Sequence, residues 1–136
     1  MNEIQIFHVE DNPGDVILTR EAFGNAGYTV PISVAKDGEE ALNLLFSLRP
    51  EKGDRLPDLI LLDINLPRVD GKEVLRRIKC DAVLRRIPVI MLTSSSLESD
   101  INECYRLHAS CYVVKPIDLL DFLKKKKKIR SFWTKW

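Results

Sequence analysis

The sequence predicts an α/β fold in which helices cover both faces of a five-stranded parallel sheet. Five short apolar runs rich in Val, Ile and Leu alternate with segments of helical period along the chain. Buried parallel strands have this composition, and strands that alternate with helices are joined by right-handed crossovers. The 136 residues, of which 45% are apolar, suffice for one compact core. We therefore expect a single domain over residues 1–136.

The five apolar runs are the expected strands, and each is five or six residues long. A doubly wound, flavodoxin-like sheet of order 2-1-3-4-5 would place the carboxyl ends of the first and third strands side by side. Ligands bind at that position in such sheets. The alternation of strands and helices does not by itself establish this order. The runs comprise residues 4–9, 30–35, 58–62, 87–92 and 110–114.

Polar side chains mark the helix starts between the strands. Asp37 and Glu40 form a capping box ahead of an apolar stripe within residues 41–48. Residues 49–57 contain two prolines and a glycine and predict a longer loop. The other starts are marked by Asn12-Pro13, by Ser95 with Glu98 three residues later, and by Asp118.

Composition excludes several classes of protein. No stretch approaches the ~20 apolar residues of a membrane span, and the first residues lack the pattern of a signal peptide. We therefore expect a cytoplasmic protein without membrane contact. The three cysteines are an odd number without C-x-x-C spacing, so they predict reduced, buried thiols rather than disulfides or a zinc site. These are Cys80, Cys104 and Cys111.

Carboxylates follow two of the expected strands. Glu10 and Asp11 close the first strand, and Asp63 closes the third. Asp63 alone could be a strand-ending residue that caps a loop. Three carboxylates on adjacent strand ends repel one another unless a cation binds among them, and Mg²⁺ prefers such oxygen ligands. We predict Asp11 and Asp63 as direct ligands, Glu10 as a ligand through water, and the backbone carbonyl of Asn65 as a further ligand.

The same strand ends predict phosphoryl chemistry. An ionised carboxylate such as Asp63 can attack phosphorus and form an aspartyl-phosphate. Phosphoryl transfer mainly requires that groups be positioned and charge be neutralised, which Lys115 and a hydrogen bond from Thr93 would do. Lys115 could instead extend to water. Because an X-Pro bond tolerates the cis form, we predict a cis peptide between Lys115 and Pro116 that aims the ammonium at the acids.

At these residues the sequence resembles the receiver domain of two-component response regulators, which accept a phosphoryl group from sensor histidine kinases. The resemblance covers nearly the whole chain. One departure is Glu at the first acidic position, where many members have Asp. The resemblance implies these roles: acidic pair Glu10 and Asp11, phosphoacceptor Asp63, switch hydroxyl Thr93, switch aromatic Tyr112 and phosphoryl-binding Lys115, with Pro67 and Gly71 in the loop after the acceptor.

A finer resemblance concerns stand-alone regulators that serve bacterial phytochrome kinases. It rests on the segment DINLPRVDG, the long loop before Asp58, the segment KPIDLLDF, and Phe132-Trp133. It implies a bacterial phytochrome as the cognate kinase. The sequence ends at Trp136, so we also expect output through a partner or through self-association rather than through a second domain.

The resemblance also implies how a signal would leave the molecule. A phosphoryl group on Asp63 would draw the Thr93 hydroxyl toward it, and Tyr112 would rotate inward into the vacated space. Without Thr93 nearby, Tyr112 would be interpreted as a half-buried aromatic residue. The changed surface would lie on the fourth helix, last strand and fifth helix and would include Leu97, Ile101, Tyr105 and Tyr112.

The C-terminal segment, at about residues 118–136, predicts a basic helix that contains aromatic residues. Residues 117–136 carry seven basic and two acidic side chains. The five lysines at 124–128 could bind nucleic acid, but a solvated helix face is the preferred interpretation. More apolar residues occur here than one buried stripe requires, so we predict a homodimer through the last two helices. The predicted interface residues are Phe122, Ile129, Phe132 and Trp133.

Other functions are less compatible with the sequence. An aspartyl-nucleophile phosphatase usually has a second acid two residues after the nucleophile, where this chain has Asn65. A phosphorylation-independent interaction module would lack part of the charged set, which is complete here. A dinucleotide carrier would need G-x-G-x-x-G after the first strand. We therefore expect a signalling protein rather than an enzyme, with His8 and His108 in structural roles.

Overall fold

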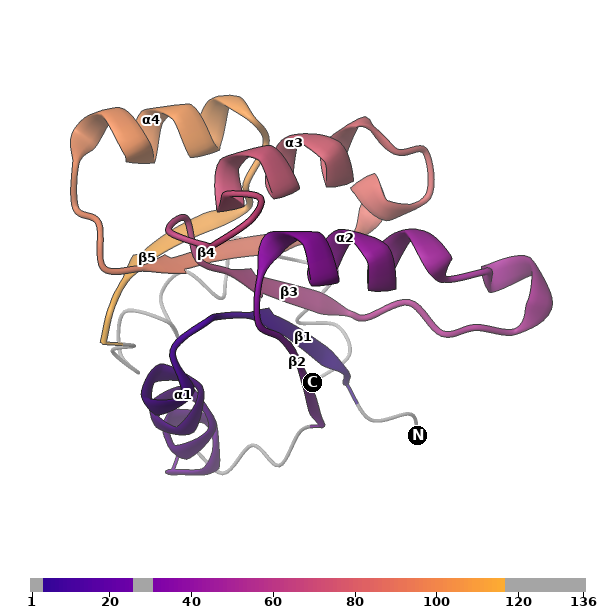
Figure 1. Ribbon diagram of the computed structural model, residues 1–136, viewed down its shortest axis with the longest axis horizontal. Helices are drawn as coiled ribbons and strands as arrows, with labels where there is room; N and C mark the ends of the chain where they lie inside the picture. The colour runs from indigo at the N-terminus through magenta and orange to yellow at the C-terminus, as the bar shows by residue number, and fades with distance from the viewer. Residues whose placement is uncertain (1–3, 26–30, 117–136) are drawn as a thin grey trace.

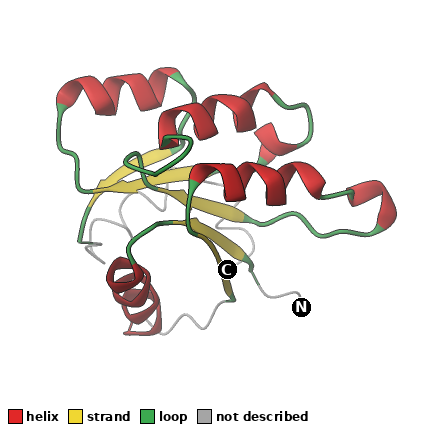
Figure 2. Ribbon diagram, viewed as in Figure 1, coloured by secondary structure: helices red, strands yellow, loops and turns green. Residues whose placement is uncertain are grey.

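The computed structural model of the protein describes residues 4–25 and 31–116. These residues form one parallel sheet of order β2-β1-β3-β4-β5 with helices between the strands (Figures 1 and 2). The predicted α/β class and strand order are therefore confirmed. The strands are β1 (Ile6–Val9), β2 (Ile32–Ala35), β3 (Leu59–Leu62), β4 (Val89–Thr93) and β5 (Cys111–Val114), and the α-helices are α1 (Pro13–Asn25), α2 (Gly38–Ser47), α3 (Gly71–Cys80) and α4 (Glu98–Arg106).

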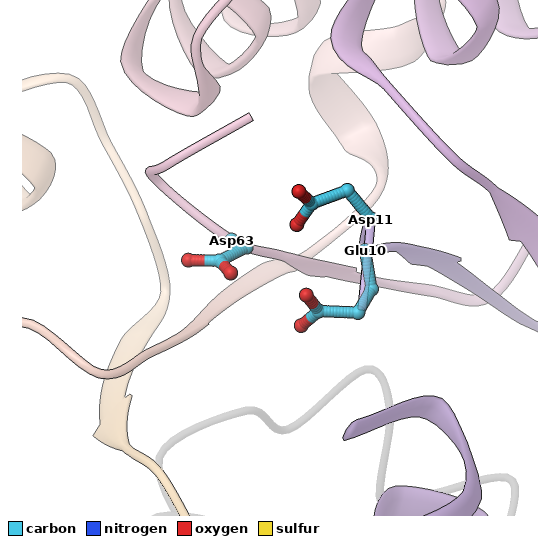
Figure 3. A group of neighbouring side chains, drawn as sticks. All are labelled: Glu10, Asp11 and Asp63. Atoms are coloured by element: carbon cyan, nitrogen blue, oxygen red, sulfur yellow. The ribbon is translucent and has the colours of Figure 1, made fainter. Parts of the chain in front are cut away.

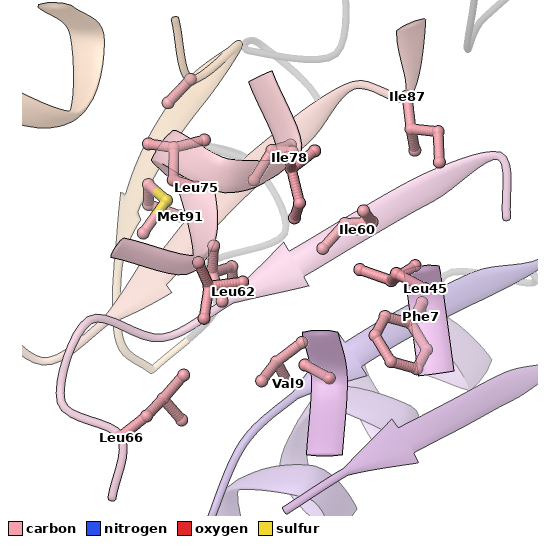
Figure 4. Close-up of a cluster of buried hydrophobic side chains, with 14 of the residues drawn as sticks. Phe7, Val9, Leu45, Ile60, Leu62, Leu66, Leu75, Ile78, Ile87 and Met91 are labelled. Carbon is pink, nitrogen blue, oxygen red and sulfur yellow. The ribbon is translucent and has the colours of Figure 1, made fainter. Parts of the chain in front are cut away.

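Helices cover both faces of the sheet. α2, α3 and α4 lie on one face, and α1 lies on the other (Figure 1). Because successive side chains of a strand point to opposite faces, the core divides into two clusters. Phe7, Val9, Ile60 and Leu62 belong to the cluster beneath α2 and α3 (Figure 4). The alternate residues of β1 and β3 pack in the second cluster with Phe23 of α1.

The central strand β3 is the most deeply buried. All of its side chains, from Leu59 to Leu62, are 0% exposed. Burial on both faces explains why β3 reads as an uninterrupted apolar run instead of an alternating one. β1 pairs with β3 so that Val9 lies opposite Leu62. The residues that follow these two positions therefore leave the sheet at the same edge.

The predicted helix starts are confirmed for α1 and α2 but not for α4. The Asn12 side chain accepts a hydrogen bond from the N–H of Gly14, and Asp37 accepts one from the N–H of Glu40. Ser95 was expected to cap a helix, but α4 begins only at Glu98 after Leu97. The Ser95 hydroxyl instead donates to an Asp100 carboxylate oxygen at 2.6 Å. The expected long loop contains a 3₁₀ turn, Pro50–Lys52.

The expectation of buried thiols is wrong for Cys80. Cys104 and Cys111 are buried, but Cys80 is exposed at the last position of α3. It borders an open hollow between α2 and α3 together with Leu42 and Phe46, so solvent reaches its thiol. Within the described ranges, no helix is both long and apolar enough to cross a membrane. Asp118 and the predicted interface residues Phe122, Ile129, Phe132 and Trp133 lie outside the described residues.

Candidate functional site

Three carboxylates gather where β1 and β3 end. The backbone N–H of Glu10 donates to the Ala35 carbonyl at 3.0 Å, and that of Asp63 donates to the Val9 carbonyl at 3.2 Å. The sheet hydrogen bonds thus continue one residue past each strand and hold these two acids in place. One ligand atom from each of Glu10, Asp11 and Asp63 lies within 4.8 Å of the others (Figure 3). The acids that the sequence predicted to meet are therefore brought together.

The three acids differ in burial. Glu10 is 2% exposed and Asp63 is 5% exposed, whereas Asp11 is exposed to solvent. Burial, together with the negative charge of Asp63, raises the pKa of Glu10 to about 7 against the opposing effect of Lys115. A charge this costly to bury is stabilised by any cation that reaches it. Because Asp11 is exposed, a cation can reach the site from solvent on that side.

Lys115 supplies one such cation from the far strand β5. Its ammonium donates to the carboxylates of Asp63 at 2.9 Å and Asp15 at 2.8 Å, and it forms an ion pair with Glu10 at 2.5 Å. Burial lowers the pKa of Lys115, but these carboxylates outweigh burial and raise it. The peptide between Lys115 and Pro116 is cis, as predicted. Lys115 therefore lies among the acids rather than extending to water.

Thr93 and Tyr112 lie on the paired strands β4 and β5, where Thr93 is opposite Val114 and Tyr112 is opposite Met91. Thr93 ends β4 and is 0% exposed, and its hydroxyl oxygen accepts a hydrogen bond from the N–H of Ser95 at 3.5 Å. Tyr112 is 3% exposed, so its ring already lies inside the molecule, and its hydroxyl donates to the Ser95 carbonyl at 2.9 Å. Burial raises the pKa of this phenol. The loop after β4 therefore contacts both predicted switch residues through Ser95.

The loop between β3 and α3 approaches the acceptor backbone closely. The N–H of Gly71 donates to the Ile64 carbonyl at 2.8 Å. A Cβ atom at Gly71 would lie 1.9 Å from the Asp63 carbonyl oxygen, so only glycine fits here without moving the loop. Asp70 caps α3 by accepting from the N–H groups of Lys72 and Glu73. These contacts fix where the Asp63 backbone leaves the sheet.

An open groove adjoins the exposed side of the acids. Its volume is about 580 Å³. Asp11 and Asn65 border it near the acids, and Lys72 and Asp100 border it on the side of α3 and α4. A group that carries a phosphoryl moiety could therefore approach the acids from solvent along this groove. The remaining lining residues are Ile64, Leu66, Pro67 and Asp70.

The residues present fit a hard divalent cation. The donor set of Glu10, Asp11 and Asp63 consists entirely of carboxylate oxygens, which Mg²⁺ and Mn²⁺ accept. Burial and the nearby charge of Asp63 raise the pKa of Glu10, so a cation bound beside it would favour its ionised form. The cluster could therefore hold a metal ion, and a bound ion would neutralise the charge that the fold concentrates at this edge.

Sequence reasoning missed two residues of this region. Asp15, in the first turn of α1, pairs with Lys115. Lys72 of α3 pairs with Asp100 and Glu103 of α4 at 2.6 and 2.8 Å. The acidic residue near a helix start was the available signal for Asp15, but it equally indicates a favourable interaction with the helix dipole. No pattern in the sequence indicates the contact of Lys72 with α4.

Known proteins share this sequence and architecture. Residues 6–127 match the family described as "Response regulator receiver domain". Two relatives are each 39% identical to this chain. The "Probable methanogenesis regulatory protein FilR2" of Methanothrix harundinacea aligns over 96% of this chain and 84% of its own length. The "Response regulator Rcp1" of Synechocystis sp. aligns over 94% and 87%.

Three similar solved structures belong to response regulators. The phosphorylated cyanobacterial phytochrome response regulator RcpA has a TM-score of 0.78 and 41% identity, covering 98% of this chain and 95% of that one. The bacteriophytochrome response regulator AtBRR has a TM-score of 0.84 and 39% identity, and the match covers 98% of this chain and 96% of that one. The Mn(2+)-bound form of Rcp1 has a TM-score of 0.75 and 38% identity, and the match covers 96% of this chain and 94% of that one. With the family match over most of its length and relatives that include phytochrome response regulators, this chain belongs to the receiver domains of two-component response regulators.

Proposed function

We propose that this protein accepts a phosphoryl group on Asp63 from a sensor histidine kinase, in a reaction that depends on Mg²⁺. The observation that best supports the proposal is the 2.9 Å contact between the Lys115 ammonium and the buried Asp63 carboxylate, within a cluster of three acids. A cation in that position can accompany negative charge as it moves onto Asp63. The proposal includes one domain over residues 1–136 and a cytoplasmic location.

In the proposed reaction, an oxygen of the ionised Asp63 carboxylate attacks the phosphorus of a phosphohistidine on the kinase. The bond between phosphorus and the imidazole nitrogen breaks, and its electron pair stays on the imidazole. The phosphoryl group is then an acyl phosphate on Asp63, and attack of water on phosphorus later restores the carboxylate. The protein assists both steps but turns over no separate substrate.

The neighbouring side chains hold charge and geometry during transfer. Lys115 pairs with an oxygen of the incoming phosphoryl group, and Thr93 donates a hydrogen bond to another. Mg²⁺, held by Glu10, Asp11, Asp63 and the backbone carbonyl of Asn65, would neutralise charge on the phosphoryl oxygens. Similar proteins support this metal, since Rcp1 has been solved with Mn²⁺ and the receiver domain of PA1611 with magnesium in its active-site cleft.

The signal would pass through the loop after β4 to the surface of α4 and β5. Movement of Thr93 toward the phosphoryl group would shift Ser95, whose carbonyl accepts the hydrogen bond from Tyr112. Tyr112 is buried before any modification, so the proposed change is a repacking of its contacts with Ser95 and Tyr105. Leu97 and Tyr105 are exposed on this face, and Ile101 is partly buried.

The cognate kinase in this proposal is a bacterial phytochrome. RcpA and AtBRR support it, because both are phytochrome response regulators about 40% identical to this chain. The homodimer through Phe122, Ile129, Phe132 and Trp133 stays part of the proposal. Sedimentation with and without the phosphate mimic beryllofluoride tests it, and a monomer under both conditions at high concentration would contradict it.

The phosphoryl acceptor can be tested with acetyl phosphate and Mg²⁺, followed by intact mass measurement. We expect wild type to gain about 80 Da, the mass of one phosphoryl group. Asp63→Asn should gain none, because the amide oxygen is a poor nucleophile. Asp54→Asn, a change in the exposed loop before β3, is the matched control and should be labelled like wild type. Unlabelled wild type at saturating Mg²⁺ would instead support an interaction module without this chemistry.

A further inference from the structure

Asp15 contacts the phosphoryl-binding lysine from outside the acidic cluster. Its Oδ2 accepts a hydrogen bond from the Lys115 ammonium at 2.8 Å, although the two residues are 100 positions apart in the chain. Asp15 does not belong to the group of acids that could hold a metal ion. We propose that Asp15 is a positioning residue, which anchors the Lys115 ammonium while the other carboxylates around it bind metal and phosphoryl group. This inference rests on the proposed function.

Local structure holds Asp15 firmly at the start of α1. The Asn12 side chain accepts from the N–H of Asp15 at 3.3 Å, and the buried hydroxyl of Thr19 donates to the Asp15 carbonyl at 2.9 Å. The Asp15 backbone is therefore bound on both sides within the first turn of the helix. Its side chain is 30% exposed and reaches Lys115 from the rim of the site. An anchor with a fixed backbone can restrict the flexible four-carbon chain of a lysine.

The three carboxylates that pair with Lys115 differ in whether they stay available to it during phosphoryl transfer. Glu10 and Asp63 both belong to the acidic cluster, so a metal ion competes with Lys115 for their charge. The Asp63 carboxylate also loses its own negative charge when one of its oxygens forms the acyl phosphate bond. Asp15 alone among these three partners keeps an unshared carboxylate throughout. It can therefore hold the ammonium at the rim at the moment when the other two contacts weaken.

Without Asp15, we expect Lys115 to shift onto Glu10 and Asp63. The ammonium would then compete with Mg²⁺ for those oxygens, and it would no longer be placed to meet a phosphoryl oxygen. Both effects slow phosphoryl transfer, and the loss of one nearby negative charge further weakens Mg²⁺ binding. The inference thus predicts a slower reaction even when Mg²⁺ is saturating, because that condition removes the binding effect and leaves the positioning effect.

The first experiment measures the rate of labelling by acetyl phosphate at saturating Mg²⁺. We expect about a tenfold lower rate for Asp15→Ala, the size typical of losing one charged hydrogen bond. Asp15→Asn keeps an acceptor oxygen without charge and should fall between Ala and wild type, and Asp15→Glu should recover part of the rate. Glu21→Gln, which removes an exposed charge from the same helix, is the matched control and should match wild type.

A double-mutant cycle with Lys115 tests whether Asp15 acts through the lysine. Asp15→Ala should slow the reaction in wild type but have no further effect in Lys115→Ala. An equal slowing in both backgrounds would overturn the inference, because Asp15 would then act through the helix. If wild type is labelled and Asp15→Ala is labelled at the same rate, the inference about Asp15 is overturned but the proposed function is not. A wild type that takes no label overturns the proposed function as well.

A second measurement does not depend on activity. The Lys115 ammonium of wild type should give a slowly exchanging ¹H–¹⁵N resonance, since three carboxylates hold it. That resonance should broaden or disappear in folded Asp15→Ala and persist in Glu21→Gln. A resonance unchanged in Asp15→Ala would show that Glu10 and Asp63 suffice to hold the lysine, and the anchoring role would be refuted.

Discussion

Lys115 Nζ lies 2.9 Å from Asp63 Oδ2, although the two residues are 52 positions apart and come from strands that are not neighbours. β4 separates their strands, so the long lysine side chain crosses the end of β4 to reach the acid. Thr93 closes β4 at that point. The acceptor, the hydroxyl and the cation are therefore brought together by the strand order, and each can contact one small group bound at this edge.

The raised pKa of Glu10 predicts how Mg²⁺ affinity depends on pH. Metal binding needs the ionised carboxylate, which below a pKa of about 7 is largely protonated in the metal-free protein. The apparent Kd for Mg²⁺ should therefore rise about tenfold per pH unit below that value and level off above it. Calorimetry in buffers of different ionisation enthalpy should detect about one proton released near pH 6. In Glu10→Gln the slope between pH 5 and about 7 should largely vanish, and an unchanged slope would exclude Glu10 as its source.

His8 predicts a stability that decreases in mild acid. Its side chain is 0% exposed, and neither ring nitrogen has a hydrogen-bond partner among residues 4–25 and 31–116. Burial, together with the positive charge of Lys115, lowers the pKa of His8 from 6.5 to about 4. In that range the unfolded chain binds the extra proton, so stability present at neutral pH is lost as pH falls from about 6.5 to 4. His8→Leu should remove this contribution.

We expect His8→Leu to be more stable than wild type by about 1 kcal/mol at pH 7, because it removes two unsatisfied buried nitrogens. The gain should grow as the pH is lowered toward about 4. Urea unfolding at several pH values measures both effects. Equal pH slopes for His8→Leu and wild type would contradict the prediction.

Gly71→Ala should disturb the acceptor loop. The added Cβ would meet the Asp63 carbonyl at 1.9 Å, and backbone on both sides leaves it little room. We expect a loss of at least about 2 kcal/mol of stability, together with slower phosphorylation of the folded fraction. Gly24→Ala adds the same methyl group to α1 where no atom lies within 4 Å, so it should be neutral or stabilising by up to about 1 kcal/mol. Thermal unfolding of both variants separates the steric effect from the general effect of adding alanine.

Lys72 joins α3 to α4, so its removal should loosen α4. Its ammonium contacts Asp100 and Glu103, and these hydrogen bonds raise its pKa. Lys72→Ala should cost about 1 kcal/mol and speed hydrogen exchange of α4 amides. Arg76→Ala is the control, because the ion pair of Arg76 within the described part of the chain is with Glu73 of the same helix. Exchange rates in α4 that match wild type for Lys72→Ala would show that this link does not restrain the helix.

Local patterns in the sequence sufficed to predict most of the fold. The apolar runs are five or six residues long and are bounded by polar or proline residues, so five strands follow from burial alone. Asp37 and Asn12 mark helix starts by short-range hydrogen bonds. Ser95 was wrongly predicted as a helix cap, because a short polar side chain bonds to whichever nearby partner is strongest. Its hydroxyl had a stronger acceptor in the Asp100 carboxylate, which lies five residues away.

The sequence by itself determined which chemical groups stand at the strand ends, because the apolar run of a strand buried on both faces ends where charged residues begin. Glu10, Asp63 and Lys115 could be named on that basis. Only the tertiary structure decided which of them touch and which further residues join them. Asp15 and Lys72 meet partners 100 and 28 positions away, and such contacts depend on how whole helices pack on the sheet, which no local pattern records.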